Sequence, residues 1–260
     1  MFNKEALNTL IVALVLCLVC SVLVSTVAVS LKGPQDTNKS LDRNKNILSA
    51  AGMFDPEKNT NADVAKLFSQ FDAKLVNIKT GKFATDAELA ADGVSVDSYD
   101  QRVAAKNPKL SEKMAEDPAG ILRQAKYAKV YLLEKDGKVN LVVLPVHGYG
   151  LWGTLYGFLV LKGDGNEIVG LSFYEHKETP GLGAKVDTEK WKALWPGKKA
   201  YTTNGDVAIE VVKGKALKDN QVDGLSGASL TTRGVNRLIR FWLGEQGFAG
   251  FLNNLKAGEA

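Results

Sequence analysis

The segment Val130-Tyr-Leu-Leu-Glu-Lys-Asp-Gly-Lys-Val-Asn-Leu-Val-Val-Leu144 carries the clearest fold signal in the chain. Two apolar runs, 130–133 and 139–144, flank the polar turn Lys135-Asp-Gly-Lys138. An Asp-Gly pair suits the tight turns between antiparallel strands, because both residues tolerate a positive φ angle. The segment therefore predicts a β-hairpin.

A second hairpin is predicted directly downstream. Residues 154–161 and 168–174 are two further apolar runs, and Gly163-Asp-Gly-Asn166 lies between them. Residues 207–212 are another strand candidate. Consecutive hairpins, rather than strands that alternate with long helices, indicate a mostly antiparallel sheet. The predicted fold class is α+β, and a Rossmann-type nucleotide fold is not expected.

Helical patterns surround these strands. They cover residues 40–52, 63–71, 97–106, 117–126, 188–195 and 230–243. The predicted domain organisation is a short N-terminal segment (1–9), a transmembrane helix (10–31), a helical and irregular peripheral layer (32–126) and a core (127–260). Since the chain has no repeats and no long Gly/Ser linker, residues 32–260 are expected to form one soluble domain.

The membrane segment is the strongest physical signal in the sequence. No charged residue occurs between Ala6 and Leu31, and residues 10–31 provide the ~20 mostly apolar residues that a spanning helix needs. We expect contact with the lipid bilayer through residues 10–31. A cleavable signal peptide is the alternative, although the apolar part of such peptides is usually only ~7–15 residues long. Basic residues are more numerous after this segment than before it, which by itself favours a cytoplasmic domain.

Composition excludes several classes of protein. The 260 residues include 33 Lys and Arg against 29 Asp and Glu, without basic clusters, so nucleic acid is not an expected partner. Two cysteines cannot form a disulfide framework, and both lie near the N-terminus, far in sequence from the two histidines, so no four-ligand zinc site and no other metal site is predicted. Cys17 and Cys20 both lie in the membrane segment, where packing is the simpler interpretation.

Two glycine-containing segments are candidate ligand sites. In Pro145-Val-His-Gly-Tyr-Gly-Leu-Trp152, His147 can exchange a proton and Trp152 offers a flat stacking surface. In Glu175-His-Lys-Glu-Thr-Pro-Gly-Leu-Gly183, the Thr179 hydroxyl can bind a polar ring edge and Leu182 can contact a ring face. A plain loop and a structural turn remain the alternatives. Neither histidine has a partner at a spacing typical of hydrolases, so no catalytic residue is predicted.

The third segment is Asp223-Gly-Leu-Ser-Gly-Ala-Ser-Leu-Thr-Thr-Arg233, at the start of the predicted helix 230–243. Ser226 or Ser229 can act as a helix N-cap. Alternatively, the free N–H groups and positive end of the helix bind a phosphate. The lysine and spacing of a Walker loop are absent.

The string Asp223-Gly-Leu-Ser-Gly-Ala-Ser229 resembles the flavinylation motif D-x-x-[ST]-G-A-[TS], whose last hydroxyl residue carries FMN through a phosphoester. Together with residues 178–183, residues 145–152 and the N-terminal anchor, the chain resembles the C subunits of sodium-translocating NADH:quinone oxidoreductases. The resemblance implies that Ser229 is the attachment site, where threonine is usual. It also implies that Asp223, Ser226, Gly227 and Ala228 shape the phosphate turn and are recognised by a flavin transferase. The residues expected near the isoalloxazine are Thr179, Leu182, Gly183, His147 and Trp152.

The same resemblance implies a membrane-anchored electron-transfer protein with covalent FMN, which relays electrons from NADH towards ubiquinone in a sodium-pumping complex. Its partners are other membrane subunits and, during maturation, a flavin transferase that uses FAD and magnesium. The implied location is the bacterial inner membrane, single-pass, with residues 127–260 as a periplasmic FMN-binding core. Two alternatives remain: a membrane-anchored assembly or binding module with noncovalent or no flavin, and the related G subunits of Rnf-type complexes. Since residues 10–31 contain no carboxylate, the ion path is expected in other subunits.

Overall fold

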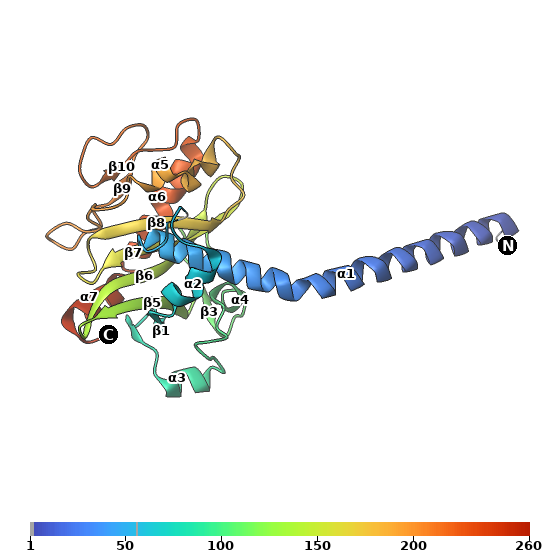
Figure 1. The fold of residues 1–260 in the computed structure, drawn as a ribbon, viewed down its shortest axis with the longest axis horizontal. Coiled ribbons are helices and arrows are strands. Elements are labelled where there is room, and N and C mark those ends of the chain that lie inside the picture. Colours follow the sequence, from blue (N-terminus) through green and yellow to red (C-terminus); the bar gives the residue numbers. More distant parts are fainter. Residues whose placement is uncertain (1–2, 56) are drawn as a thin grey trace. The chain divides into compact units, whose positions relative to one another are not determined.

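The computed structural model describes residues 3–55 and 57–260, so residues 1 and 2 of the predicted segment 1–9 lie outside the described residues. The chain divides into two compact units, with the boundary between Arg43 and Asn44. Figure 1 shows the order of the elements along the chain.

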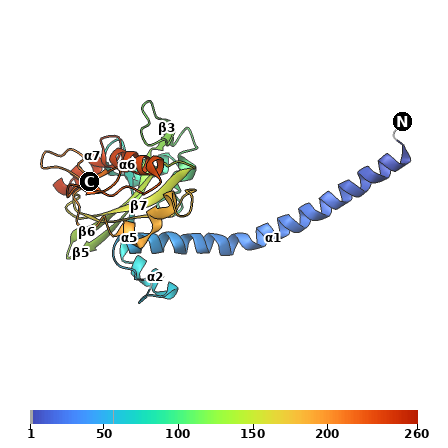
Figure 2. The same ribbon diagram turned by 90° about the horizontal axis from the view of Figure 1, so that it is seen from above.

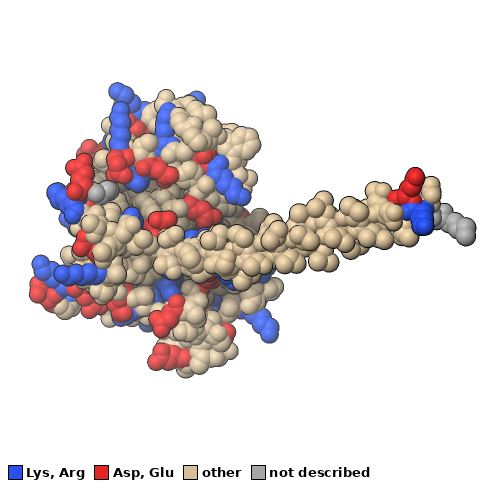
Figure 3. Space-filling model, turned by 45° about the vertical axis from the view of Figure 1, so that its right-hand side comes forward, with Lys and Arg blue, Asp and Glu red and all other residues tan. Residues whose placement is uncertain are grey.

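The first unit consists of most of helix α1 (Lys4–Ala50), a helix of 47 residues. An 18-residue window of α1 has a mean hydropathy of 3.0, so the helix has the length and composition to cross a membrane. Large apolar side chains are exposed along it, and Figure 3 shows how little charge this stretch carries. The separate helix expected over 40–52 is the C-terminal part of α1. It closes as predicted at a glycine, because Gly52 has a φ of +69°.

The second unit contains one six-stranded sheet with the order β2-β1-β5-β6-β7-β8, in which every pair is antiparallel. The two predicted hairpins are its centre, which confirms the α+β fold class. At the first turn, Asp136 and Gly137 have φ angles of 54° and 71°, as a tight hairpin requires. The strand bounds are β1 (Phe71–Asn77), β2 (Lys82–Phe83), β5 (Tyr127–Lys135), β6 (Lys138–Tyr149), β7 (Thr154–Lys162) and β8 (Ile168–Glu175).

Two small sheets and several helices complete this unit. β3 (Ser111–Lys113) pairs with β4 (Arg123–Ala125), and β9 (Glu210–Val211) pairs in parallel with β10 (Gln221–Val222). The helices are α2 (Asn61–Phe68), α3 (Asp86–Ala91), α4 (Gln101–Ala104), η1 (Gly183–Asp187), α5 (Glu189–Lys192), α6 (Ser229–Leu243) and α7 (Ala249–Ala257). Figure 2 shows α6 and α7 together on one side of the sheet.

The layout of the predicted peripheral layer, 32–126, is wrong in two places. Residues 71–77 form β1, which pairs along its whole length with β5 and belongs to the main sheet. The helix expected over 117–126 does not form, and residues 123–125 are strand β4 instead. The Asp117 carboxylate accepts hydrogen bonds from the N–H groups of Ile121 and Leu122, which holds this segment in a turn.

Helix α6 positions the site, because it lies along the main sheet with one apolar face buried. Buried residues on this face include Val235, Leu238, Ile239 and Trp242. Gly148 in β6 allows the close approach, since a Cβ atom there would lie 2.5 Å from Leu238 Cβ. The packing of α6 on the sheet therefore fixes the direction of the helix and its distance from the sheet, and so the position of its N-terminus.

Candidate functional site

Ser229 is the first residue of α6, and its side chain is exposed. The N-cap residue is Ala228, and no side chain of the described residues caps this end of the helix. The first N–H groups of a helix lack intrahelical acceptors, and the helix dipole places partial positive charge there. The N-terminus of α6 is thus open to an anionic group, and the alternative that Ser226 or Ser229 is the N-cap is wrong.

The turn before α6 is held by backbone geometry and by Asp223. The Asp223 carboxylate accepts a hydrogen bond from the N–H of Ala216 at 2.7 Å, so this side chain braces the turn. Gly227 has a φ of +82°, a conformation that strongly favours glycine. The Ser226 carbonyl accepts a hydrogen bond from Lys185 Nζ at 2.9 Å, which brings a positive charge beside the turn.

The loop that follows β8 lies against this turn. Its Thr179 carbonyl accepts a hydrogen bond from the Leu182 N–H at 3.1 Å, and Gly181 has a φ of +75°. Leu182 is 44% exposed. A Cβ atom built on Gly227 would lie 3.1 Å from Leu182 Cδ2, so the Leu182 side chain covers the turn next to Ser229.

The loop expected over 145–152 is shorter than predicted, because β6 continues to Tyr149 and the turn is only 150–153. Its Gly150 N–H donates to the Gly153 carbonyl at 2.8 Å. Trp152 in this turn is 62% exposed. Helix α6 passes directly behind the turn, since a Cβ atom on Gly234 would lie 2.5 Å from the Tyr149 carbonyl oxygen.

A residue that the sequence analysis did not select, Glu178, connects these segments. Its side chain is 5% exposed. Oε1 accepts hydrogen bonds from the backbone N–H groups of Leu151 at 2.9 Å and Trp152 at 3.1 Å. Oε2 accepts a hydrogen bond from the hydroxyl of Thr231 in α6. Because glutamate is almost never fully buried, its residue type does not suggest a buried position. The one sequence feature that points to Glu178 is its place in the segment 175–183.

The structure brings together nine of the ten predicted residues, around the start of α6. They are Trp152, Thr179, Leu182, Gly183, Asp223, Ser226, Gly227, Ala228 and Ser229. Leu230, directly after Ser229, is 50% exposed, and with Trp152 and Leu182 it gives this surface an apolar character. A ligand with an anionic group and a flat ring suits this surface. The open N-terminus of α6 can bind the anionic group, and the exposed apolar side chains can cover the ring.

His147 does not lie with them, and its predicted place beside the isoalloxazine stays a prediction. It belongs to β6, and its ring centroid lies 5.5 Å from that of Tyr156 and 4.9 Å from that of Trp242. Trp242 is 13 residues beyond Ser229 in α6, which corresponds to about 20 Å along the helix axis. Burial, and secondarily the charge of Arg102, lowers the pKa of His147 to about 4. The imidazole is a neutral packing group.

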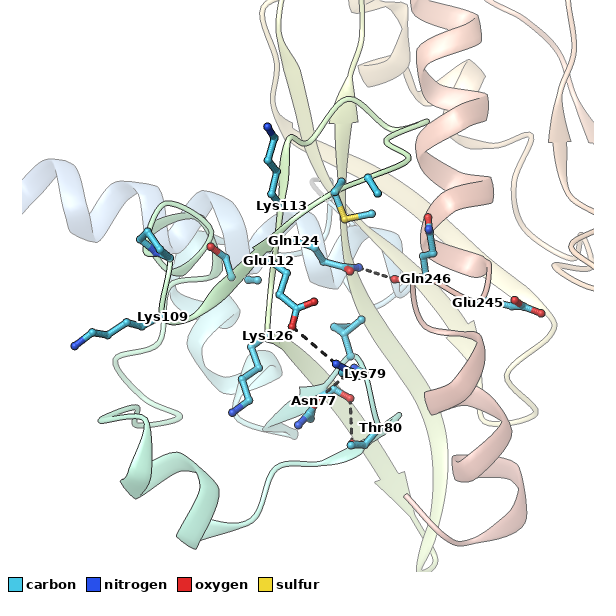
Figure 4. Close-up of a pocket in the computed structure, with 16 residues that line it drawn as sticks. Asn77, Lys79, Thr80, Lys109, Glu112, Lys113, Gln124, Lys126, Glu245 and Gln246 are labelled. Carbon is cyan, nitrogen blue, oxygen red and sulfur yellow. Dashed lines mark hydrogen bonds and ion pairs between the residues drawn. The ribbon is translucent and has the colours of Figure 1, made fainter.

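A groove of about 620 Å³ lies elsewhere on the second unit (Figure 4). It is lined by residues 77–80, 108–109, 111–115, 124–126 and 245–246. Lys79 Nζ lies 4.0 Å from Glu112 Oε1 in this groove, and Gln124 Nε2 donates to the Gln246 carbonyl at 2.6 Å. None of the ten predicted residues is among the described residues that line it, so the groove is separate from the candidate site.

Comparison with known proteins agrees with this geometry. Residues 150–244 match the family described as FMN-binding domain. This range begins in the β6–β7 turn, ends just after α6, and contains all the predicted site residues except His147.

The similarity to known proteins extends over the whole chain. The chain is 48% identical over 268 residues to the C subunit of the Na(+)-translocating NADH-quinone reductase of Pseudomonas aeruginosa, with 100% of each chain covered. It is 41% identical to the C subunit of the same reductase from Pasteurella multocida, covering 98% of this chain and 97% of the relative. The crystal structure of NqrC from Shewanella oneidensis superposes with a TM-score of 0.75 at 37% identity, covering 85% of this chain and 99% of that one.

Proposed function

Because this chain belongs to the family of Na(+)-translocating NADH-quinone reductase C subunits, we propose that it carries FMN on Ser229 through a phosphoester and relays electrons towards ubiquinone. Family membership makes it a membrane-associated component of an oxidoreductase complex, with an FMN-binding domain and other subunits as partners. The covalent bond and the direction of electron flow are the proposed parts. The observation that carries the proposal is the exposed Ser229 hydroxyl at the uncapped N-terminus of α6.

The residues around Ser229 fit a phosphoester. The free N–H groups and dipole of α6 stabilise the negative charge of the phosphate. The left-handed Gly227 turns the chain so that backbone can lie close to an anion without a side chain in the way. The Lys185 ammonium, bonded to the Ser226 carbonyl, adds positive charge nearby.

The apolar part of the site fits a flavin ring. Trp152 provides a stacking face and Leu182 an aliphatic contact, and the exposed Thr179 in the same loop as Leu182 offers a hydroxyl to a polar ring edge. Gly183 lies against Glu178 and Thr231 and so places the end of this loop. FMN supplies the electron-transfer chemistry when bound, so the chain's residues have to orient the ring and shield it from water. This role needs no protein nucleophile.

Attachment requires one group transfer, catalysed by a separate flavin transferase with FAD and magnesium. Ser229 Oγ forms a bond to the phosphorus of the FMN half of FAD, the bond to the AMP half breaks, and the hydroxyl proton is released. Asp223, Ser226, Gly227 and Ala228 hold the turn that the transferase recognises.

The attachment is tested by intact mass and in-gel flavin fluorescence of denatured protein, after expression with the transferase. We expect one phosphoester-linked FMN in the wild type, none in Ser229→Ala, and retention in Ser229→Thr, which keeps the hydroxyl. Flavin that is released on denaturation of the wild type favours the noncovalent alternative. No flavin at all, with a transferase active on a control protein, favours an assembly role.

We further propose that residues 10–31 of α1 span the inner membrane and that the second unit is periplasmic. Both cysteines lie in the spanning segment, so a cysteine introduced at Leu217, which is 91% exposed, gives a specific label. A membrane-impermeant maleimide should label Leu217→Cys in cells with a permeabilised outer membrane. The control variant Lys4→Cys should react only after lysis, and the opposite pattern would place the domain in the cytoplasm.

A further inference from the structure

Glu178 is unusual because it is the one Asp, Glu, Lys or Arg among the described residues whose side chain is buried. Burial of a charge is unfavourable unless hydrogen bonds compensate it. The carboxylate meets this condition with three donors, the N–H groups of Leu151 and Trp152 and the hydroxyl of Thr231. Three donors match the acceptor-only character of an ionised carboxylate.

The backbone around Glu178 leaves room for this carboxylate at two glycines. A Cβ atom on Gly150 would lie 2.5 Å from Oε1, and one on Gly183 would lie 2.6 Å from Oε2. Contacts this short exclude any side chain larger than hydrogen, unless the carboxylate moves. The two loops at the candidate site are therefore shaped around Glu178.

No lysine or arginine of the described residues forms an ion pair with Glu178. Its neighbour His176 accepts a hydrogen bond from the Glu178 backbone N–H at Nδ1, so the ring proton lies on Nε2, toward Asp187. The direct hydrogen-bond partners of the Glu178 carboxylate are two backbone N–H groups and one hydroxyl. This carboxylate lies directly beneath the turn that carries Trp152.

We infer that Glu178 is the positioning residue of the cofactor site. Its carboxylate fixes the 150–153 turn, the 178–183 loop and the first turn of α6 in one arrangement. The same negative charge makes the flavin harder to reduce, and this second effect rests on the proposed function. The Glu178 carboxylate therefore has two effects, because it fixes the positions of these segments and its charge changes the reduction equilibrium of the flavin. A neutral amide would provide the first effect alone.

The positioning role is tested without flavin, by hydrogen–deuterium exchange on the full chain in detergent with Ser229→Ala as background. Glu178→Ala and Thr231→Val should each increase exchange at residues 150–153, because each removes part of the link between that turn and α6. Glu189→Gln, an exposed carboxylate in α5, is the matched control and should change nothing at the site. If exchange rose only in the 178–183 loop for Glu178→Ala and only in α6 for Thr231→Val, the positioning role would be overturned.

The electrostatic role is tested with Glu178→Gln, which preserves shape and removes the charge. The amide oxygen of the substituted side chain can still accept from Leu151 and Trp152, so flavin attachment by intact mass should be retained. Titration against a reference dye should show the reduction equilibrium shifted about tenfold toward reduced flavin, as expected when one buried unit charge near the flavin is removed. Glu189→Gln should shift it far less. An unchanged equilibrium in Glu178→Gln would overturn the electrostatic role, whereas a wild type without covalent flavin would contradict the proposed function and leave the exchange test valid.

Discussion

The two ends of helix α6 have opposite characters. At its N-terminus, Ser229 is exposed and Ala228 leaves the helix without a side-chain cap. At the C-terminal end, Trp242 is fully buried, its ring packs against His147 and Phe248, and its Nε1 donates to the His147 carbonyl at 2.7 Å. The end with histidine and tryptophan maintains the fold, whereas the end with small residues has the open polar groups that a ligand needs.

The largest expected effect is a difference in the free energy of unfolding between substitutions at the two ends of α6. Trp242→Ala should lower the free energy of unfolding by about 4 kcal/mol, because it leaves a large cavity and removes a buried hydrogen bond. Ser229→Ala should change it by less than about 0.5 kcal/mol, as for most surface substitutions. Urea unfolding of the full chain in detergent, followed by tryptophan fluorescence, measures both. Since all four tryptophans lie in the second unit, the signal reports on that unit alone. Equal losses of unfolding free energy in Trp242→Ala and Ser229→Ala would contradict the difference between the two ends.

A smaller but more local effect is expected between the two ends, at Gly234. Gly234→Ala places a methyl group 2.5 Å from the Tyr149 carbonyl oxygen, and we expect unfolding to become easier by about 2 kcal/mol. The same change should reduce flavin attachment, because it displaces the turn that carries Trp152. Gly250→Ala is the matched control, since Gly250 also lies in a helix and the nearest atom, Gly81 Cα, is 3.8 Å away. The control should be neutral or stabilising by up to about 1 kcal/mol.

The buried end should also make the protein sensitive to acid. The pKa of His147 is about 4 in the folded protein against an ordinary 6.5, mainly because of burial, so the unfolded chain takes up a proton that the folded chain refuses. Stability from this group is present above pH 6.5 and should fall by about 2 kcal/mol between pH 7 and pH 5.

The two histidines of the chain have opposite effects on how stability changes with pH, so His176 serves as the control for His147. A hydrogen bond to Asp187 raises the pKa of His176, so His176 adds stability below its ordinary pKa and loses it as pH rises. His147→Gln should therefore flatten the loss of stability on acidification, and His176→Gln should steepen it. Urea unfolding at pH 5, 6 and 7 compares the three proteins, and identical slopes would refute the assignment.

The sequence predicts the centre of the fold well because its signals there are local. Asp136 and Gly137 take the positive φ angles that their residue types allow, and the apolar spacing over 230–243 matches the buried face of α6. The sequence does not indicate strand β1, because Asp72 and Lys74 interrupt its apolar residues and pairing with β5 makes it a strand. Tertiary context overrides local propensity at such positions.

The site shows the same division. Ser229, Gly227 and Leu182 belong to short motifs whose geometry is local, and the fold brings them together. The His147 ring packs against Trp242, 95 positions away, and the Glu178 carboxylate accepts a hydrogen bond from Thr231, 53 positions away. No spacing rule within one segment encodes contacts between residues so far apart. The sequence could therefore name Ser229 as the proposed attachment site, but it could not identify the buried carboxylate of Glu178.

The smallest expected effect tests directly whether the N-terminus of α6 favours an anion, independently of any flavin. Ser229→Asp should raise the free energy of unfolding by about 0.5 kcal/mol, and Ser229→Lys should lower it by a similar amount, because charges in the first turn interact with the helix dipole. The difference should shrink in 1 M salt, where charges are screened beyond about 3 Å. The same pair of substitutions at Leu217, exposed and outside any helix, should show no such difference. If Asp and Lys were equivalent at position 229 in low salt, the open helix end would have no electrostatic preference. The proposed phosphoester would then depend on the proposed transferase alone for its placement.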